Sequence, residues 1–386
     1  MKPYTLGHTQ ESSIKKLILL SSLCLSHTLA AETLKGFETD VYGFIRASAI
    51  YSSGGVASFS NTNAVAPTHA SARTNVQDDT SRLSFQLQQS RIGTTLKKQD
   101  ILARLEFDFV DFNKATPTTQ MVPRVRIASV TYGWENQKVI IGQDWDLFSP
   151  TSPLTYNYVG NYFLAGNSGF MRQQLQYLRT EGDYELGGAI GLANSNPAAN
   201  ENDTELSRSP SYAARISKKL DNGKVGLSGI YAHLSYRAND VISTDAYGIN
   251  AFYEKTFGLL TFRSEAYYGQ NLSNLGALTL GKGTSEADVK EFGGYASAQY
   301  KLSEKNFVFG GAGIAMVDNR SEIPHVPASP AVRKNFLTRF GWEYRIQEDF
   351  SWITEVSRYD TTNKLADNRY QVNIVGSLES GIQLRF

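Results

Sequence analysis

The chain has 386 residues, of which 41% are hydrophobic and 19% charged, and this balance excludes an intrinsically disordered chain. Its formal net charge is +1, so nothing in the charge indicates nucleic acid as a partner. The mean hydropathy of −0.32 fits a soluble protein, and it fits equally a membrane β-barrel, in which only one face of each strand meets lipid.

The N-terminal segment has the three parts of a secretory signal peptide. Lys15 and Lys16 precede a mostly apolar run from Leu17 to Leu25, and small residues follow as far as Ala30 and Ala31. The run is too short to cross a bilayer as a helix. We therefore expect residues 1–30 to be a cleaved signal peptide and residues 31–386 to form the exported protein.

The only cysteine, Cys24, lies inside this signal and follows a bulky leucine, which does not suit lipoprotein processing. The exported chain is therefore expected to have neither disulfides nor thiolate chemistry. Its charge is nearly balanced, because residues 1–30 carry three Lys or Arg and one Asp or Glu and the remainder carries 35 basic and 36 acidic residues.

Apolar and polar side chains alternate with a period of two almost to the end of the chain, and no stretch is long and apolar enough for a membrane helix. Runs of about ten to fifteen residues exceed the usual strand of a soluble sandwich and favour tilted membrane strands. In chain order, clear apolar faces are Leu105, Phe107 and Phe109; Tyr247, Ile249, Ala251 and Tyr253; Leu260, Phe262, Ala266 and Tyr268; and Phe336, Phe340, Trp342 and Tyr344.

The connections alternate between short and long. Short ones rich in Asp, Asn and Gly, which suit tight hairpins, lie at 97–100, 135–138, 181–183, 221–224, 257–258, 303–306 and 347–349. Long ones lie at 53–80, 113–123, 147–171, 196–207, 238–243, 272–287, 320–331 and 361–369. Seven short turns and eight long loops predict an all-β transmembrane antiparallel barrel of about 16 strands, with short periplasmic turns and long external loops.

Three strands are ambiguous, and counts of 14 or 18 strands stay open. Val225–Arg237 and Phe350–Asp360 carry apolar residues on both parities, and Phe307–Val317 is mostly small or apolar. A bulge, a subunit contact or a different register would each explain this pattern. Because Phe307–Val317 contains Gly310, Gly311 and Gly313, we expect it to pack against another subunit of a homotrimer.

The C-terminal segment from Tyr370 to Phe386 alternates most clearly. Its even positions are mainly apolar and its odd positions mainly polar, so one face suits lipid and the other water. The chain ends on Phe386, which we interpret as an assembly signal for insertion into the outer membrane.

Four segments of the first half carry a resemblance to a known family. They are Tyr42–Tyr51, Ser90–Gly93, Gly142–Phe148 followed by Pro150, and Arg172–Tyr177. In this order they resemble the DcaP-type porins, trimeric channels associated with dicarboxylates. The resemblance implies a homotrimeric channel in the Gram-negative outer membrane, with lipid around it and small anions such as dicarboxylates passing through it. Members often carry an N-terminal helical segment before the barrel, whereas few residues separate the signal from the first strand here.

The third long connection, 147–171, is expected to fold into the pore and narrow it, as the third external loop does in sixteen-stranded porins. It is rich in Gly and aromatic residues, including Tyr156 and Tyr158, and carries no charge between Asp146 and Arg172. The alternative is an ordinary surface loop of the same composition.

Arginines of the early strands have the parity expected to face the lumen. Rows of such side chains attract anions and repel cations. The alternative is a set of ion pairs that carry no selectivity, because Glu106 and Asp108 lie on the same wall. The expected pore-lining residues are Arg46, Arg91, Arg104, Arg124, Arg126 and Arg172, with Glu106, Asp108, Tyr156 and Tyr158.

Catalysis finds little support in the sequence. The exported chain has three histidines, His69, His233 and His325, without metal-ligand spacing, and no Gly-x-Ser-x-Gly elbow is present. We therefore expect a passive channel without catalytic residues, metal or cofactor. The alternatives are a structural or adhesive barrel with a plugged lumen and a membrane-embedded hydrolase.

Overall fold

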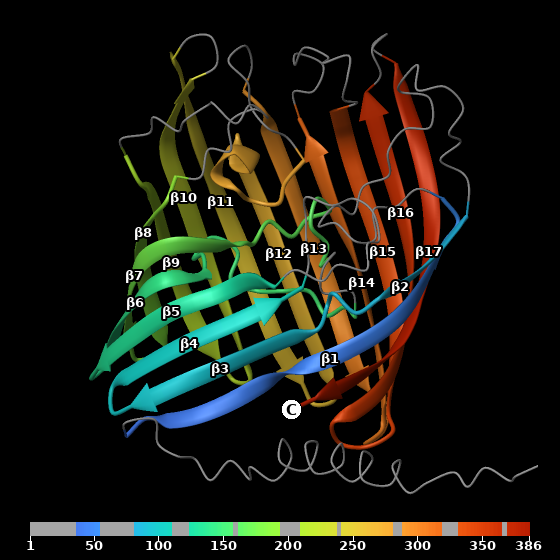
Figure 1. The fold of residues 1–386 in the computed structure, drawn as a ribbon. Helices are drawn as coiled ribbons and strands as arrows, with labels where there is room; N and C mark the ends of the chain where they lie inside the picture. The colour runs from blue at the N-terminus through green and yellow to red at the C-terminus, as the bar shows by residue number, and fades with distance from the viewer. Residues whose placement is uncertain are drawn as a thin grey trace, which may run out of the picture.

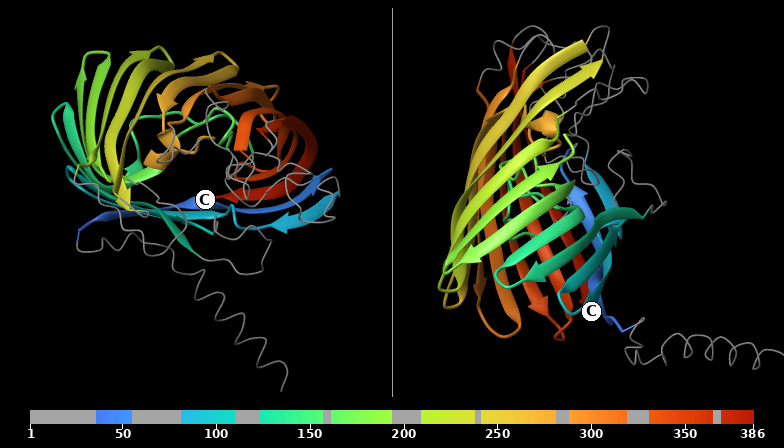
Figure 2. Two further views of the ribbon diagram at one scale, coloured as in Figure 1. Left: turned by 90° about the horizontal axis from the view of Figure 1, so that it is seen from above. Right: turned by 90° about the vertical axis from the view of Figure 1, so that its left-hand side faces the viewer.

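Each strand pairs antiparallel with its neighbour, and the resulting sheet closes into a barrel (Figures 1 and 2). This is a computed structural model. Closure joins the last strand to the first along Phe44–Ser52. No helix in the described parts of the chain is long and apolar enough to span a membrane. The structure describes residues 36–54, 81–109, 123–156, 161–193, 209–237, 241–280, 288–318, 331–364 and 369–386.

The described strands follow one another around the barrel, and only one short helix, η1, lies between them. Their bounds are β1 (Glu38–Ser52), β2 (Arg82–Gln86), β3 (Arg91–Lys98), β4 (Ile101–Asp108), β5 (Arg124–Trp134), β6 (Gln137–Trp145), β7 (Met171–Glu181), β8 (Tyr184–Gly191), β9 (Ser211–Leu220), β10 (Gly223–Arg237), β11 (Val241–Phe257), β12 (Leu260–Gln270), η1 (Leu272–Leu275), β13 (Lys290–Lys301), β14 (Asn306–Val317), β15 (Ala331–Arg345), β16 (Phe350–Lys364) and β17 (Tyr370–Arg385).

Strands β2 and β3 together form one interrupted barrel strand. The upper part of β1 pairs with β2 and the lower part with β3, so the 17 described segments make 16 positions around the barrel. At the break, Ser90 replaces the missing ladder bonds of Arg46. The Arg46 N–H donates to Ser90 Oγ at 3.0 Å, and that hydroxyl donates back to the Arg46 carbonyl at 3.3 Å. The expected 16-stranded antiparallel barrel is confirmed.

The short turns gather at one end of the barrel, near the C-terminus (Figure 1). Positive φ values at Asn222 (56°), Gly182 (57°) and Gly258 (58°) provide the left-handed residue that such hairpins need. The predicted long connections start from the other end, and most of their residues lie outside the described parts, as does the predicted signal peptide. The connection at 147–171 is largely described.

The two faces of the wall differ as the alternation predicts. On β17, Val372 and Ile374 point outward and are 57% and 53% exposed, whereas Glu379 and Gln383 point inward and are buried. An apolar exterior around a polar interior is stable only when lipid surrounds the barrel. The lipid-facing assignment of the even positions is therefore confirmed.

For two of the three ambiguous strands the structure gives an explanation that was not expected. No register shift occurs within Val225–Arg237, Phe307–Val317 or Phe350–Asp360, so the bulge and the altered register are wrong. Instead, inward apolar residues are covered by segments inside the barrel. Ile230 and Leu234 of β10 pack in a cluster with Phe148, and Ile353 of β16 packs with Tyr156.

Candidate functional site

The described residues between β6 and β7 lie inside the barrel (Figure 2, left). Two buried carboxylates bind their outgoing part. Glu265 of β12 accepts hydrogen bonds from the N–H and the hydroxyl of Thr151, both at 2.8 Å. Glu355 of β16 accepts from Thr155 Oγ1 at 2.6 Å and from Tyr156 N at 2.8 Å. We call the described residues 146–156 and 161–170 the inner loop.

The returning part of the inner loop fits against the wall because the wall has glycines there. At Gly313 of β14, an added Cβ would lie 2.1 Å from the Ala165 carbonyl oxygen, so no larger residue permits this contact. Asn335 Nδ2 of β15 donates to the Leu164 carbonyl at 3.0 Å, and Leu164 N donates to Leu278 O at 3.0 Å. The inner face of β14 therefore receives the loop, and of its small residues Gly310 and Ala312, of opposite parity, remain for the predicted subunit contact.

Arg46 lies under the inner loop. It is 1% exposed and donates to Gln383 Oε1 at 3.0 Å, to Gln89 Oε1 at 2.7 Å and to the Tyr156 carbonyl. Its guanidinium also lies 3.9 Å from the centre of the Tyr156 ring. Through its contacts with Tyr156, Arg46 anchors the inner loop to β1.

Arginines and carboxylates of β3, β4 and β5 meet on the wall opposite the inner loop. Arg124 donates to both oxygens of Asp108, at 2.9 and 2.6 Å. Arg126 bridges Glu106 at 2.8 Å and Asp108 at 3.1 Å, and Arg91 lies 3.5 Å from Glu106. The structure therefore brings together five of the predicted residues, which we call the basic wall.

Arg104 of β4 lies beside this group and has its own partner. Its Nη2 is 2.6 Å from Asp144 Oδ1 of β6, and Ser129 Oγ donates to the other oxygen of that carboxylate at 2.9 Å. With Arg104 and Asp144 included, four arginines face three carboxylates. These arginines are thus paired, as the alternative held, yet among the described residues of this group one positive charge is in excess.

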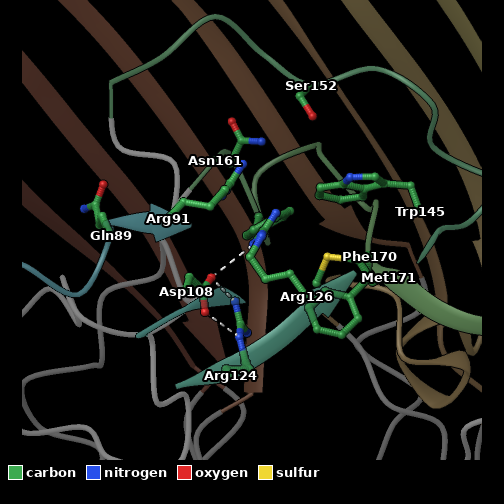
Figure 3. Close-up of a pocket in the computed structure, with 11 residues that line it drawn as sticks. Gln89, Arg91, Asp108, Arg124, Arg126, Trp145, Ser152, Asn161, Phe170 and Met171 are labelled. Carbon is green, nitrogen blue, oxygen red and sulfur yellow. Dashed lines mark hydrogen bonds and ion pairs between the residues drawn. The ribbon is translucent and has the colours of Figure 1, made fainter. Parts of the chain in front are cut away.

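A cavity of about 150 Å³ separates the basic wall from the inner loop. Arg124 and Arg126 converge on Asp108 on one side, with Trp145 beside them and Ser152 and Asn161 across the space (Figure 3). Several lining residues, such as Asp108, Trp145 and Met171, stand at strand ends remote from the short turns. The cavity therefore opens toward the long-loop side of the constriction. We call it the outer chamber.

Arg172 and Tyr156, two other predicted residues, are buried at the inner loop. Arg172 is 8% exposed, donates to the carbonyls of Leu192 and Leu275 at 2.7 Å each, and lies 3.7 Å from Asp146. Burial raises the pKa of Asp146, while Arg172 and hydrogen bonds from Ser149 and Phe148 oppose the shift. Arg172 thus ties the start of β7 to the loop base.

Tyr156 is 2% exposed under the loop, and Tyr158 lies outside the described residues. Burial raises the pKa of Tyr156 to about 12, although Arg46 acts in the opposite direction. Glu265 and Glu355 were missed as site residues. Their inward parity was visible in the sequence, but nothing there indicates which inward carboxylate meets a loop.

Known proteins resemble this chain in structure but not detectably in sequence. No family model and no curated protein matches the chain. Among solved structures, the outer membrane channel DcaP of Acinetobacter baumannii has a TM-score of 0.69 at 16% identity, covering 92% of this chain and 98% of that one. An anion-selective porin from Comamonas acidovorans has a TM-score of 0.59 at 11% identity, covering 91% and 100%. OmpT, an outer membrane protein of Vibrio cholerae, has 0.56 at 12%, covering 92% and 100%.

At these identities the likeness establishes the fold. The chain has the fold of the outer-membrane porins, and the predicted resemblance to DcaP is confirmed at that level. Its apolar exterior and closed sheet belong in the Gram-negative outer membrane.

Proposed function

We propose that the protein is a passive diffusion channel for small hydrophilic solutes that favours anions such as dicarboxylates. The outer chamber carries this proposal, because there the inner loop leaves only a narrow space beside an arginine-rich wall. Charges in such a confined, poorly screened space act on a permeating ion more strongly than charges at a wide mouth.

The sign of the selectivity follows from the balance of charge at this point. Four arginines face three carboxylates on the basic wall and beside it, whereas the described loop residues across the chamber, Ser152 and Asn161, are neutral. Guanidinium groups also bind carboxylates through paired hydrogen bonds. A small dicarboxylate is therefore a suitable solute. The anion-selective porin from Comamonas acidovorans has a related fold.

We propose further that the barrels form a homotrimer. A trimer form is known for OmpT of Vibrio cholerae, whose fold is similar. If β14 contributes to the contact, the small residues of its outward face are Gly310 and Ala312.

Reversal potentials across a KCl gradient in planar bilayers test the proposal. The unaltered protein is expected to prefer chloride. Arg126→Ser leaves Glu106 and Asp108 with one arginine partner fewer each, so it should shift the potential toward cation selectivity. Arg104→Ser should shift it in the same direction.

Arg179→Gln is the matched control, because Arg179 is half-exposed on the outer face and pairs with Glu181. It should leave the potential unchanged. Cation selectivity in the unaltered protein would reject the anion preference. An absence of conductance would support the plugged barrel instead.

A further inference from the structure

A second cavity, of about 340 Å³, lies on the other side of the inner loop. Three arginines line it, namely Arg263, Arg345 and Arg385. Arg345 ends β15 beside a short turn, and Arg385 ends β17. The cavity therefore opens toward the short-turn side, and we call it the inner chamber. Ser152 of the inner loop lines both chambers.

One carboxylate, that of Glu343, forms ion pairs with two of these arginines. Glu343 is 4% exposed, and its Oε1 lies 3.1 Å from Arg385 Nη1 and 3.5 Å from Arg345 Nε, while Ser351 Oγ donates to it at 2.8 Å. A guanidinium has five N–H donors, so one shared carboxylate occupies only part of their capacity. The side chains of Arg345 and Arg385 remain 38% and 34% exposed.

Arg263 completes the chamber from the opposite strand, β12. It donates to the Ser152 carbonyl at 3.2 Å and to Glu254 at 3.2 Å. Among the described residues, its buried Nε has no hydrogen-bond partner. Three arginines thus meet two carboxylates, and one positive charge is again in excess.

The other residues of the chamber wall are largely apolar, and they strengthen the electric field of the arginines inside the chamber. Pro153, Leu154, Phe309 and Ile353 line it, and apolar walls focus the field of nearby charges. The Arg345 guanidinium lies 4.0 Å from the centre of the Phe307 ring, a contact that holds it in place without using its hydrogen-bond donors.

We propose that the inner chamber is a second anion site, which takes small carboxylates through Arg345 and Arg385. In the proposed channel, a carboxylate that has crossed the inner loop from the side of the outer chamber meets these two guanidiniums. The inference rests on the proposed channel function in one respect only, namely that the lumen conducts. The two sites lie on opposite sides of the loop, so each is reached first from a different side of the membrane.

Side-specific block tests the proposal. The protein is added to one compartment of a planar bilayer so that the channels share an orientation, and succinate is added to either side in KCl. Arg345→Gln with Arg385→Gln should raise the half-blocking succinate concentration about tenfold from one side, as expected for lost charge-assisted hydrogen bonds. Arg91→Gln with Arg124→Gln should raise it from the opposite side.

The outcomes separate this proposal from the channel's selectivity. Equal effects of both double variants from the same side, no effect of the Arg345 and Arg385 changes, or no block of the unaltered protein would each overturn the second site. The reversal potential in KCl tests anion preference independently. A cation-selective channel with side-specific block would reject the preference and keep the site.

Glu343→Gln distinguishes loss of the anion site from misfolding of the Arg345 and Arg385 double variant. It removes the shared counter-charge and keeps the shape of the side chain, so it should lower the half-blocking concentration on the side that Arg345 and Arg385 control. A folding defect would not produce tighter block. Arg179→Gln, on the outer face, should change neither side.

Discussion

Two buried glutamates hold the inner loop, and their surroundings differ in one important way. Glu265 receives its hydrogen bonds from the loop residues Ser149 and Thr151. Glu355 additionally lies 3.7 Å from Arg339, which is itself buried. A change at Glu355 therefore also removes an ion-pair partner of Arg339 in the wall, whereas a change at Glu265 acts mainly on the loop.

Glu265→Gln is expected to loosen the inner loop. Both oxygens of Glu265 accept hydrogen bonds, and an amide offers only one oxygen, so Ser149 or Thr151 loses its acceptor and loop docking should weaken by about 1–3 kcal/mol. Single-channel recordings should then show higher conductance and more open-channel noise. The control is Glu304→Gln, which alters an exposed glutamate in the turn before β14. Unchanged conductance in Glu265→Gln would show that this carboxylate does not hold the loop.

At the residue scale, parity alone predicted which arginines face inward. It could not distinguish Arg46 and Arg172, which are buried against backbone carbonyls of Tyr156 and Leu275, from Arg91 and Arg124, which line the outer chamber. Alternation in a strand specifies the face of the sheet and not the depth or the partner. The partners come from other strands, whose relative stagger is set only when the barrel closes.

At the scale of elements, the break between β2 and β3 is the main irregularity of the wall. Strand β1 pairs with both pieces, and Ser90 bridges the interval between them. One hydroxyl thus satisfies both the N–H and the carbonyl of Arg46. The backbone of Arg46 is thus held in place at the break by Ser90 and not by regular β-ladder hydrogen bonds, and this fixes the side chain of Arg46 under the loop.

Ser90→Ala is expected to destabilise the barrel. It leaves the buried N–H of Arg46 without its partner, which should lower the free energy of unfolding by about 1–3 kcal/mol. Urea titration, with the electrophoretic shift of the unboiled protein as readout, measures the change. Ser264→Ala, on the outward face of β12, is the matched control. Equal stability of the two variants would contradict the bridging role of Ser90.

The sequence predicted most elements because period-two alternation and tight-turn residues are local signals. It missed the break at 87–90, since the strand pattern resumes in both pieces. It also misjudged Val225–Arg237 and Phe350–Asp360, where inward apolar residues such as Ile230 and Ile353 have the composition of a lipid face. These inward residues are apolar because the inner loop covers them. The path of that loop depends on contacts between residues far apart in the sequence, which a local pattern does not reveal.

At the scale of the whole molecule, the barrel closes between its two chain ends. Gly43 and the terminal Phe386 exchange backbone hydrogen bonds, at 2.9 Å from Gly43 N and 3.2 Å from Phe386 N. The Phe386 residue is 49% exposed on the outside of the barrel. The residue that we interpret as an assembly signal is thus also the last link of the seam between β1 and β17.

Deleting Phe386 is therefore expected to lower the amount of folded barrel in the outer membrane. The loss removes two hydrogen bonds of the seam and an exposed aromatic side chain at its end. Membrane fractionation and the mobility shift on boiling measure the folded yield. Phe386→Tyr, which keeps the ring and both backbone groups, should retain most of it. Full insertion of the shortened chain would remove the basis for a terminal signal.

The positions of the loop anchors also set an order of events during folding. The inner loop lies early in the chain, but it is held by Glu265 of β12 and Glu355 of β16. Contacts between residues this distant in sequence form slowly, because much chain entropy is lost before they form. A half-inserted barrel that β16 has not yet joined lacks the Glu355 anchor, so the constriction is complete only when the last strands join. The pore therefore narrows at the end of assembly. A barrel stalled before that step has a wider and more permeable pore than the finished channel.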